Sequence, residues 1–295
     1  MSTQACASGA NPPATDPFLC SERVDLDAYL HRLGLDRSLA NEPPSLESLR
    51  TIQLAHACTI PFENLDVVLG RPIKLDLPSV ANKLINQRRG GYCFEQNNLI
   101  IRVLEQLGYQ VDALSGRVRA AVPREITPAR THLFARVTID SVPWIVDVGV
   151  GGFTPSEPIR MDTTEPQETR HDTRRVIQDD HVHGLPRWFH QVLIDDHWLD
   201  IYDFTGEHMP PIDRHVGNWW TSTSPHSKFR QAVMAARAEP DGSRHTLSTK
   251  QYAHRKDGQV IEKIEFDSTA MLLEVLADRF GLELPADTTF GIDGM

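Results

Sequence analysis

The sequence predicts an α+β protein in three parts, and three observations lead to this fold class. Apolar residues recur at helical spacing through the first third of the chain. Short runs rich in Val, Ile and Leu, a pattern typical of strands, dominate the middle. Both patterns return toward the end, and no internal repeat is visible. A helical part, a strand-rich part and a mixed part are therefore expected in that order.

Three helices are expected in the first third. Ser45 can cap the second helix, which breaks at Pro61, and glycines follow the first and third helices as stop signals. The expected ranges are residues 25–33, 45–60 and 93–107.

Strand-like runs begin after residue 108. They cover residues 109–118, 131–139, 143–148, 188–199 and 260–266. Residues 161–187 are polar and His-rich, and we expect a loop or an insertion there. A final helix is expected over residues 268–279, followed by Gly281.

The composition excludes several classes of partner. The formal net charge of −10 argues against nonspecific binding to nucleic acid or anionic lipid, because phosphate contacts need clustered Lys and Arg. No segment approaches the roughly 18 apolar residues that a membrane helix requires. Residues 1–16 contain no Lys, no Arg and no apolar run, so no secretory signal is expected, and residues 1–20 are expected to form a flexible tail.

The cysteines point to a reducing compartment. They lie far apart, without a CxxC pair, at Cys6, Cys20, Cys58 and Cys93. A cytoplasmic protein without disulfides is therefore expected. Cys58 has the pattern of a structural residue on the second helix, and Cys6 and Cys20 lie in or near the tail.

Cys93 differs from the other cysteines in its position. It follows Gly90 and Gly91 and begins the third expected helix. The N-terminus of a helix stabilises negative charge, so a thiol there loses its proton more easily, and glycines let the backbone approach a ligand. A reactive thiol and a buried residue at a helix start both fit this local pattern. A reactive thiol would need a partner base.

His132 and Asp147 fall on one face of a predicted hairpin. With a turn at residues 139–140, His132 lies opposite Asp147; with a turn at 140–141, Asp147 lies opposite Phe134 and diagonal to His132. A longer loop or a bulge would undo this pairing. An aspartate beside a histidine fixes the ring tautomer and stabilises imidazolium, although a solvated hairpin face also commonly carries such a pair.

Residues 89–97 (RGGYCFEQN) resemble the signature of the arylamine N-acetyltransferase family, and they are the most specific of several matching stretches. The others follow in the expected order, at residues 60–65 (IPFENL), 131–133 (THL), 146–149 (VDVG), 218, 224–225, 227–229 and 279–285 (RFGLELP). The resemblance extends from about residue 22 to the C-terminus.

This resemblance implies a fold and a reaction. The fold would comprise an N-terminal helical bundle (residues 21–108), a central β-barrel (109–205) and a C-terminal α/β lid (206–295), with a triad like that of cysteine proteases. Cys93 would be the nucleophile, His132 the base and Asp147 the group that orients it. Acetyl-CoA would acylate Cys93, and an arylamine, arylhydrazine or hydrazide would then take the acetyl group. Backbone N–H groups near Cys93 would hold the oxyanion, and no metal is expected.

The resemblance also implies ligand contacts. The acceptor pocket would be lined by Phe62, Val118 and Val150. The expected neighbours of CoA are Gly149, Trp220, Thr223, His226 and Ser227. Val150 stands where many bacterial members have Phe, and His226 stands where some have Thr, so the preferred acceptor and donor stay open.

Two other residue groups have simpler interpretations. The His and Asp residues of the polar stretch match no compact zinc spacing, and we expect a solvated insertion; they are His171, Asp179, Asp180, His181 and His183. The tryptophans, including Trp219 and Trp220, are expected to pack rather than to stack on nucleobases, because no basic groove accompanies them.

Three alternative functions share parts of this pattern. An amide synthase that releases a polyketide chain would keep the fold and the triad. A thiol hydrolase of the papain or transglutaminase type shares the Cys-His-Asp order, and a binding protein could retain an inert triad. The residues around Cys93 disfavour the hydrolase, and the complete triad disfavours the binding protein.

Overall fold

The first third of the chain forms helices around a long central helix, α5. The computed structural model describes residues 22–182 and 185–292; the expected tail, Cys6, Cys20 and His183 lie outside them. The helical elements are α1 (Leu26–Leu33), the 3-10 turn η1 (Arg37–Asn41), α2 (Leu46–Thr59), α3 (Leu65–Val68), α4 (Leu77–Ala81), the π-type turn η2 (Asn82–Asn86) and α5 (Cys93–Gln106). Side-chain oxygens of Asp25, Ser45 and Asp76 cap α1, α2 and α4 by accepting from backbone N–H groups. The three predicted helices are confirmed as α1, α2 and α5.

An eight-stranded antiparallel sheet follows the helices. Its members are β2 (Gln110–Val118), β3 (His132–Ile139), β4 (Val142–Val146), β5 (Ile159–Arg160), β6 (Gln167–Glu168), β7 (Thr173–Val182), β8 (Leu185–Ile194) and β9 (His197–His208). The strand order is β5-β4-β3-β2-β9-β8-β7-β6. Because β5 also contacts β7, the sheet curls into a nearly closed barrel.

The expectation of a loop or insertion over residues 161–187 is wrong, because this stretch supplies β6, β7 and the start of β8. Its polar composition hides the strand pattern. Arg174 of β7 is fully buried, and Val176, two residues further along the same face of the strand, is 2% exposed. The burial of Arg174 is possible because its guanidinium pairs with Asp172 at 2.5 Å. A charge paired inside the barrel thus takes a position where an apolar residue is expected.

A five-stranded sheet and three helices complete the structure. The strands, in sheet order, are β1 (Phe62–Glu63), β10 (Met234–Ala238), β11 (Arg244–Ser248), β12 (Gln251–Lys256) and β13 (Gln259–Glu265). The helices are α6 (Pro211–Thr223), α7 (Lys228–Gln231) and α8 (Thr269–Phe280). The expected strand near residue 260 and the expected final helix are confirmed as β13 and α8. The strands β10, β11 and β12 and the helix α6 were not predicted from the sequence. In β1, Phe62 pairs with Ala236, so a segment of the first third belongs to this sheet.

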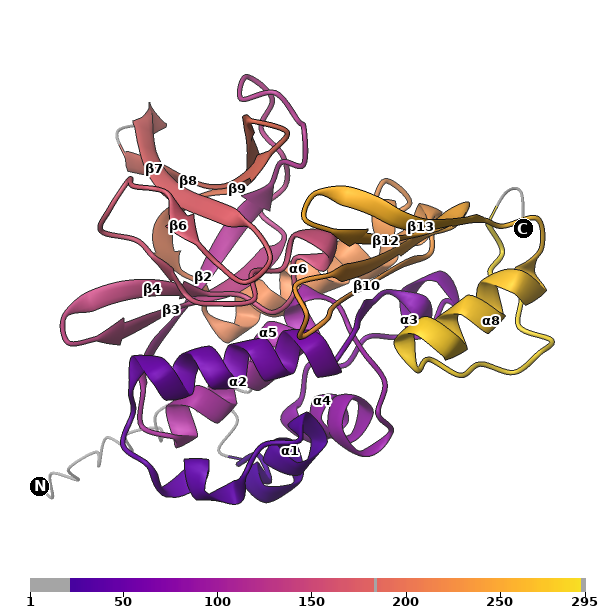
Figure 1. The fold of residues 1–295 in the computed structure, drawn as a ribbon, viewed down its shortest axis with the longest axis horizontal. Helices are drawn as coiled ribbons and strands as arrows, with labels where there is room; N and C mark the ends of the chain where they lie inside the picture. The colour runs from indigo at the N-terminus through magenta and orange to yellow at the C-terminus, as the bar shows by residue number, and fades with distance from the viewer. Residues whose placement is uncertain (1–21, 183–184, 293–295) are drawn as a thin grey trace, which may run out of the picture.

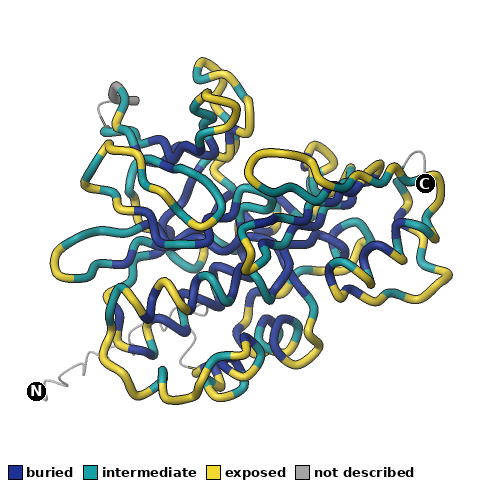
Figure 2. The backbone as a smooth tube through the Cα atoms, viewed as in Figure 1, coloured by how far each residue is buried: buried dark blue, intermediate teal, exposed yellow. Residues whose placement is uncertain are grey.

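Three groups of elements meet around α5. In Figure 1 the helices α1, α2 and α4 lie below, the barrel lies at the upper left, and the second sheet with α8 lies at the right. Figure 2 shows buried residues concentrated where these groups meet. No helix within residues 22–182 and 185–292 is long and apolar enough to cross a bilayer.

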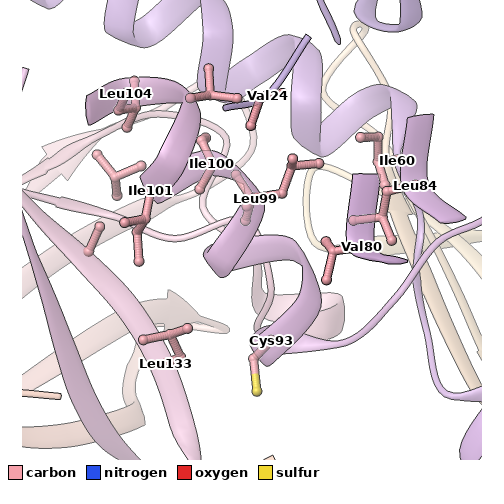
Figure 3. Packing of buried hydrophobic residues seen from close by; sticks show 14 of the residues in the cluster. Val24, Ile60, Val80, Leu84, Cys93, Leu99, Ile100, Ile101, Leu104 and Leu133 are labelled. Carbon is pink, nitrogen blue, oxygen red and sulfur yellow. The ribbon is translucent and has the colours of Figure 1, made fainter. Parts of the chain in front are cut away.

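The main hydrophobic core fixes the position of α5. Its aliphatic side chains pack against the other helices and against Leu133 of β3 (Figure 3). Cys93, the first residue of α5, is 4% exposed, and its sulfur points away from the labelled aliphatic side chains (Figure 3). Seven of the ten buried residues of α5 are apolar, and their burial fixes the helix that carries this thiol.

Candidate functional site

Cys93 lies where α5 begins, at the boundary between helices and barrel. Its Sγ is 3.6 Å from the carbonyl oxygen of Thr131, the residue before β3. The unsatisfied N–H groups of the first helical turn surround it with partial positive charge. This position favours a sulfur anion.

The β3–β4 hairpin places a histidine and an aspartate beside this thiol. Its strands pair Ile139 with Val142 and Ala135 with Val146, so the turn is Asp140-Ser141. The second of the two predicted registers is therefore confirmed, and continued pairing sets Asp147 opposite Phe134 and diagonal to His132. The diagonal is short enough for direct contact: His132 Nε2 donates to Asp147 Oδ2 at 2.7 Å.

Asp147 is held by three donors in a fully buried position. Its second oxygen, Oδ1, accepts from Asn97 Nδ2 at 2.9 Å and from the Gly149 N–H at 2.9 Å. Asn97 lies one turn beyond Cys93 on α5 and also donates to the Leu133 carbonyl at 2.7 Å. One amide side chain thus links the helix of the thiol to both strands of the hairpin.

The charges of these groups support one another. Burial alone would lower the pKa of His132, but the charge and hydrogen bond of Asp147, together with the Cys93 side chain, raise that pKa to about 10. Burial acts to raise the pKa of Asp147, but the His132 charge and the donors Asn97 and Gly149 outweigh it, so the pKa is lowered. Because Nε2 faces Asp147, the other ring nitrogen, Nδ1, is left for Cys93. The arrangement can maintain a thiolate beside an imidazolium at neutral pH.

Two buried ion pairs hold the loop that precedes Cys93. Arg89 Nη2 lies 2.7 Å from Glu63 Oε1, and Lys83 Nζ lies 2.7 Å from Glu95 Oε1. The other Glu95 oxygen accepts from the Tyr92 N–H at 3.1 Å. Asp66 contacts both cations as well, Lys83 at 2.8 Å and Arg89 at 3.4 Å, so the two pairs belong to one partly buried network. These pairs therefore fix the backbone on which the thiol depends.

A cavity of about 530 Å³ opens onto Cys93 and His132 and is called the main cavity. The barrel side supplies Val118, Arg119 and the loop that follows, and the second sheet supplies Met234, Ala236 and Leu247. Phe62, Phe153 and Phe229 place three aromatic rings on its wall. A mostly apolar wall with one reactive corner suits a flat organic substrate.

Most of the residues predicted to contact ligands line the main cavity. They are Phe62, Val118, Gly149, Val150, Trp220, His226 and Ser227. Ser227 is 1% exposed, and its hydroxyl donates to the Thr221 carbonyl at 2.6 Å, so it caps α7 and holds the loop. Thr223 is the exception: it is absent from the lining, is exposed and donates to the Trp219 carbonyl.

Trp219 and the His-rich stretch differ from the sequence expectation. Trp219 is 65% exposed on the outer side of α6, so the expectation that it packs is wrong. His171 faces the Glu239 carbonyl at 2.9 Å, whereas Asp179 pairs with Arg124. Within the described parts of the chain, no three potential metal ligands gather at one place.

The pKa of Cys58 is raised by burial to about 11, in keeping with a structural cysteine.

Asn97 is the functional candidate that sequence reasoning missed. It belongs to the specific stretch around Cys93, but a polar residue one helical turn from a thiol has many possible partners. Only the packing of α5 on β3 shows that it contacts Asp147. Phe153 and Phe229 were missed for a similar reason, because they reach the main cavity from a 3-10 turn and a four-residue helix.

The chain is similar to a well-defined set of known proteins. A family model described as N-acetyltransferase matches residues 45–289. The arylamine N-acetyltransferase / N-hydroxyarylamine O-acetyltransferase of Salmonella typhimurium is 38% identical over 239 residues, which cover 81% of this chain and 83% of the relative. The arylamine N-acetyltransferase of Mycolicibacterium smegmatis is 38% identical over 265 residues, covering 88% and 93%.

Solved structures give the same result. The Mycobacterium marinum arylamine N-acetyltransferase in complex with CoA superposes with a TM-score of 0.80 at 38% identity, covering 87% of this chain and 92% of that one. The Salmonella typhimurium enzyme superposes with a TM-score of 0.81 at 35% identity, covering 93% and 96%.

Proposed function

This chain belongs to the arylamine N-acetyltransferase family, and from that premise we propose how its own residues carry out the reaction. It is an acyltransferase that uses acetyl-CoA as the acetyl donor and an arylamine as the acceptor. We propose that the acetyl group passes through a thioester on Cys93, and that hydrazines and hydrazides also serve as acceptors. The observation that carries the proposal is the contact of His132 with Asp147 on one side and Cys93 on the other.

In the first half-reaction the Cys93 thiolate attacks the thioester carbonyl carbon of acetyl-CoA. Negative charge develops on the carbonyl oxygen, where backbone N–H groups at the start of α5 stabilise it. The bond between this carbon and the CoA sulfur then breaks. CoA leaves as a thiolate and takes a proton from the His132 imidazolium, so that Cys93 carries the acetyl group and His132 is neutral.

In the second half-reaction the amine nitrogen attacks the acetyl carbon on Cys93. Neutral His132 accepts a proton from this nitrogen, and the carbon–sulfur bond to Cys93 breaks. The amide leaves, and the thiolate–imidazolium pair is restored. Asp147 holds the ring in place and stabilises its charge through both steps.

The main cavity supports an aromatic acceptor. Its rings from Phe62, Phe153 and Phe229 provide an apolar wall for an aryl group, while Cys93 and His132 lie at one corner. Val118 and Val150 leave more room than aromatic residues would at the same positions. The cavity thus suits an aryl ring whose amine reaches toward the thiol.

The direct test is to incubate the protein with acetyl-CoA in the absence of an acceptor. Intact-mass measurement should show one added acetyl group per chain and an equal amount of free CoA. Peptide mapping should place the group on Cys93, and Cys93→Ala should gain none. A thiol hydrolase would instead release acetate continuously without lasting modification, and that result would refute the proposal.

A further inference from the structure

A partly buried arginine joins the second sheet to the barrel beside the main cavity. Arg244 is the first residue of β11, and its side chain is 13% exposed. Its Nη1 donates to the Thr154 carbonyl at 2.7 Å, and its Nη2 donates to Asp172 Oδ2 at 2.9 Å. Thr154 lies between β4 and β5, and Asp172 directly precedes β7. One guanidinium group therefore connects three segments of the chain.

Thr154 closes the 3-10 turn η3 (Gly151–Phe153), which forms part of the cavity wall. The Thr154 N–H donates to the Gly151 carbonyl at 3.0 Å, and the Thr154 hydroxyl oxygen accepts from the Val150 N–H at 3.1 Å. Val150 and all three residues of η3 line the main cavity. Arg244 thus binds the residue that holds this turn closed.

Asp172 fixes the direction of the Arg244 side chain. Its carboxylate also accepts from Nε and Nη2 of Arg174, at 2.5 Å and 2.7 Å, and Arg174 is fully buried in the barrel. Burial acts to raise the pKa of Asp172, but the charges and hydrogen bonds of the two arginines outweigh it and hold that pKa below its ordinary value. The carboxylate therefore stays ionised at neutral pH and provides Arg244 with a fixed anchor.

The turn η3 also packs closely against β11. A Cβ added at Gly152 would lie 3.0 Å from the methyl carbon of Thr246, two residues after Arg244. Thr246 lines the main cavity from the second sheet, and Phe153 lines it from the turn. The position of Arg244 therefore sets the distance between these two walls of the cavity.

We propose that Arg244 is a positioning residue for acceptor specificity: by binding Thr154 and Asp172 together, it holds η3 and the Phe153 ring at the distance from β11 that an aryl acceptor requires. A guanidinium group suits this role, because its planar fork of N–H donors binds two acceptors in a fixed geometry. Arg244 is not among the residues that line the main cavity, so it acts through the wall rather than by contact with the substrate. This inference rests on the proposed acetyl transfer, because it concerns the half-reaction in which the amine attacks acetylated Cys93.

The test compares an acceptor that has an aryl ring with one that has none. The first is 4-methoxyaniline and the second is hydrazine, and the measured quantity is the ratio of their kcat/KM values. We expect Arg244→Met to lower this ratio about tenfold, mainly through the KM for the arylamine, because the aryl wall is misplaced. Acetylation of Cys93 by acetyl-CoA should keep its wild-type rate, since the hydrogen bonds of the His132–Asp147 pair do not involve Arg244.

Two further variants examine how Arg244 acts. Arg244→Lys should recover part of the loss, because an ammonium group keeps the charge but cannot bind both acceptors in the same fixed geometry. Arg237→Met is the matched control: Arg237 belongs to β10 of the same sheet, is 23% exposed, pairs with Glu239 and is not part of the cavity lining. This variant should keep the wild-type ratio.

A merely structural role for Arg244 gives a different result. Loss of folded protein would slow the reactions with both acceptors and the acetylation of Cys93 together, and the ratio would not change. An unchanged ratio in Arg244→Met, or in Arg244→Lys where the methionine variant does not fold, would overturn the proposal, as would an equal fall of the ratio in Arg237→Met. Failure of wild type to form the Cys93 adduct would instead refute the acetyl transfer itself.

Discussion

Gly149 determines how closely the segment after β4 approaches Cys93. A Cβ at this position would lie 2.7 Å from Cys93 Cα and 2.8 Å from Asn97 Nδ2. Neither neighbour is the free end of a flexible side chain, because the first is backbone and the second is bound to Asp147. The glycine is therefore required for close packing at the site.

We expect Gly149→Ala to lower the free energy of unfolding by about 1–3 kcal/mol and to slow acetylation of Cys93, because the helix and the hairpin must move apart. Urea unfolding and the rate of adduct formation measure the two effects. Gly152→Ala is the matched control, since its Cβ would meet only the Thr246 methyl, at 3.0 Å. Equal stability and equal rates in the two variants would contradict this explanation.

At the residue scale, part of the site was predictable from the sequence. The position of Cys93 after two glycines and the shared face of His132 and Asp147 follow from helix and strand periodicity. The role of Asn97 could not be predicted from the sequence, because its hydrogen-bond partners are 36 and 50 residues away along the chain. Long-range contacts of this kind depend on how elements pack, which local patterns do not encode.

At the scale of elements, formation of the His132–Asp147 contact depends on the β3–β4 hairpin. Asp140 and Ser141 have φ angles of 50° and 66°, the left-handed region that a two-residue type I′ turn requires. This turn fixes the register that brings His132 and Asp147 together. A slip of one residue would move Asp147 to the other face of the sheet.

Substitutions at Ser141 should test this turn in both directions. We expect Ser141→Gly to raise the free energy of unfolding by about 0.5 kcal/mol, because glycine adopts positive φ without strain. Ser141→Val should lower it by more than 1 kcal/mol, since a β-branched residue disfavours this conformation. Acetylation should follow the same order. A more stable valine variant would show that the turn does not control the hairpin.

The elements that sequence analysis missed share a cause. Residues 161–187 do not show the apolar alternation typical of strands, because a charged residue is buried there: Arg174, which pairs with Asp172. The strands β10, β11 and β12 contain charged residues that are half-buried rather than exposed, and α6 begins at Pro211, directly after Pro210, and contains Gly217. Periodicity detects elements with an apolar face, and these elements carry part of their stability in paired charges instead.

At the scale of the whole molecule, the site depends on contact between all three groups of elements. The thiol comes from the helices, the His132–Asp147 pair from the barrel, and one wall of the main cavity from the second sheet. The division into bundle, barrel and lid at residues 108 and 205 stays a prediction. The pairing of β1 with β10 ties the first and last groups together, so the helical part is not independent of the sheet.

Stability should depend on pH through buried histidines. Burial, the largest effect, lowers the pKa of His56 and of His190 to about 3, below the ordinary value of 6.5. Their contribution is therefore present above pH 6.5 and is lost as pH falls toward 3. The pKa of His132 is raised to about 10, so its contribution is present below pH 6.5 and is lost as pH rises through 10. We expect maximal stability near pH 6.5.

Urea unfolding at several pH values checks this expectation. The destabilisation caused by His132→Gln should shrink between pH 6.5 and pH 10, whereas His190→Gln should reduce the loss of stability below pH 6.5. Parallel pH profiles for wild type and both variants would contradict the assignment of these effects to the two histidines.

We propose that Asp147 holds the His132 ring beside Cys93 and keeps that ring protonated, so that the imidazolium can stabilise a thiolate. The most direct measurement is the rate of Cys93 alkylation by iodoacetamide between pH 6 and 9, followed by peptide mapping that separates it from Cys58. We expect wild type to react faster than Asp147→Asn at every pH in this range, because the His132 imidazolium that Asp147 stabilises faces the thiol. Equal rates in wild type and Asp147→Asn across the range would show that the carboxylate does not act on the thiol through His132.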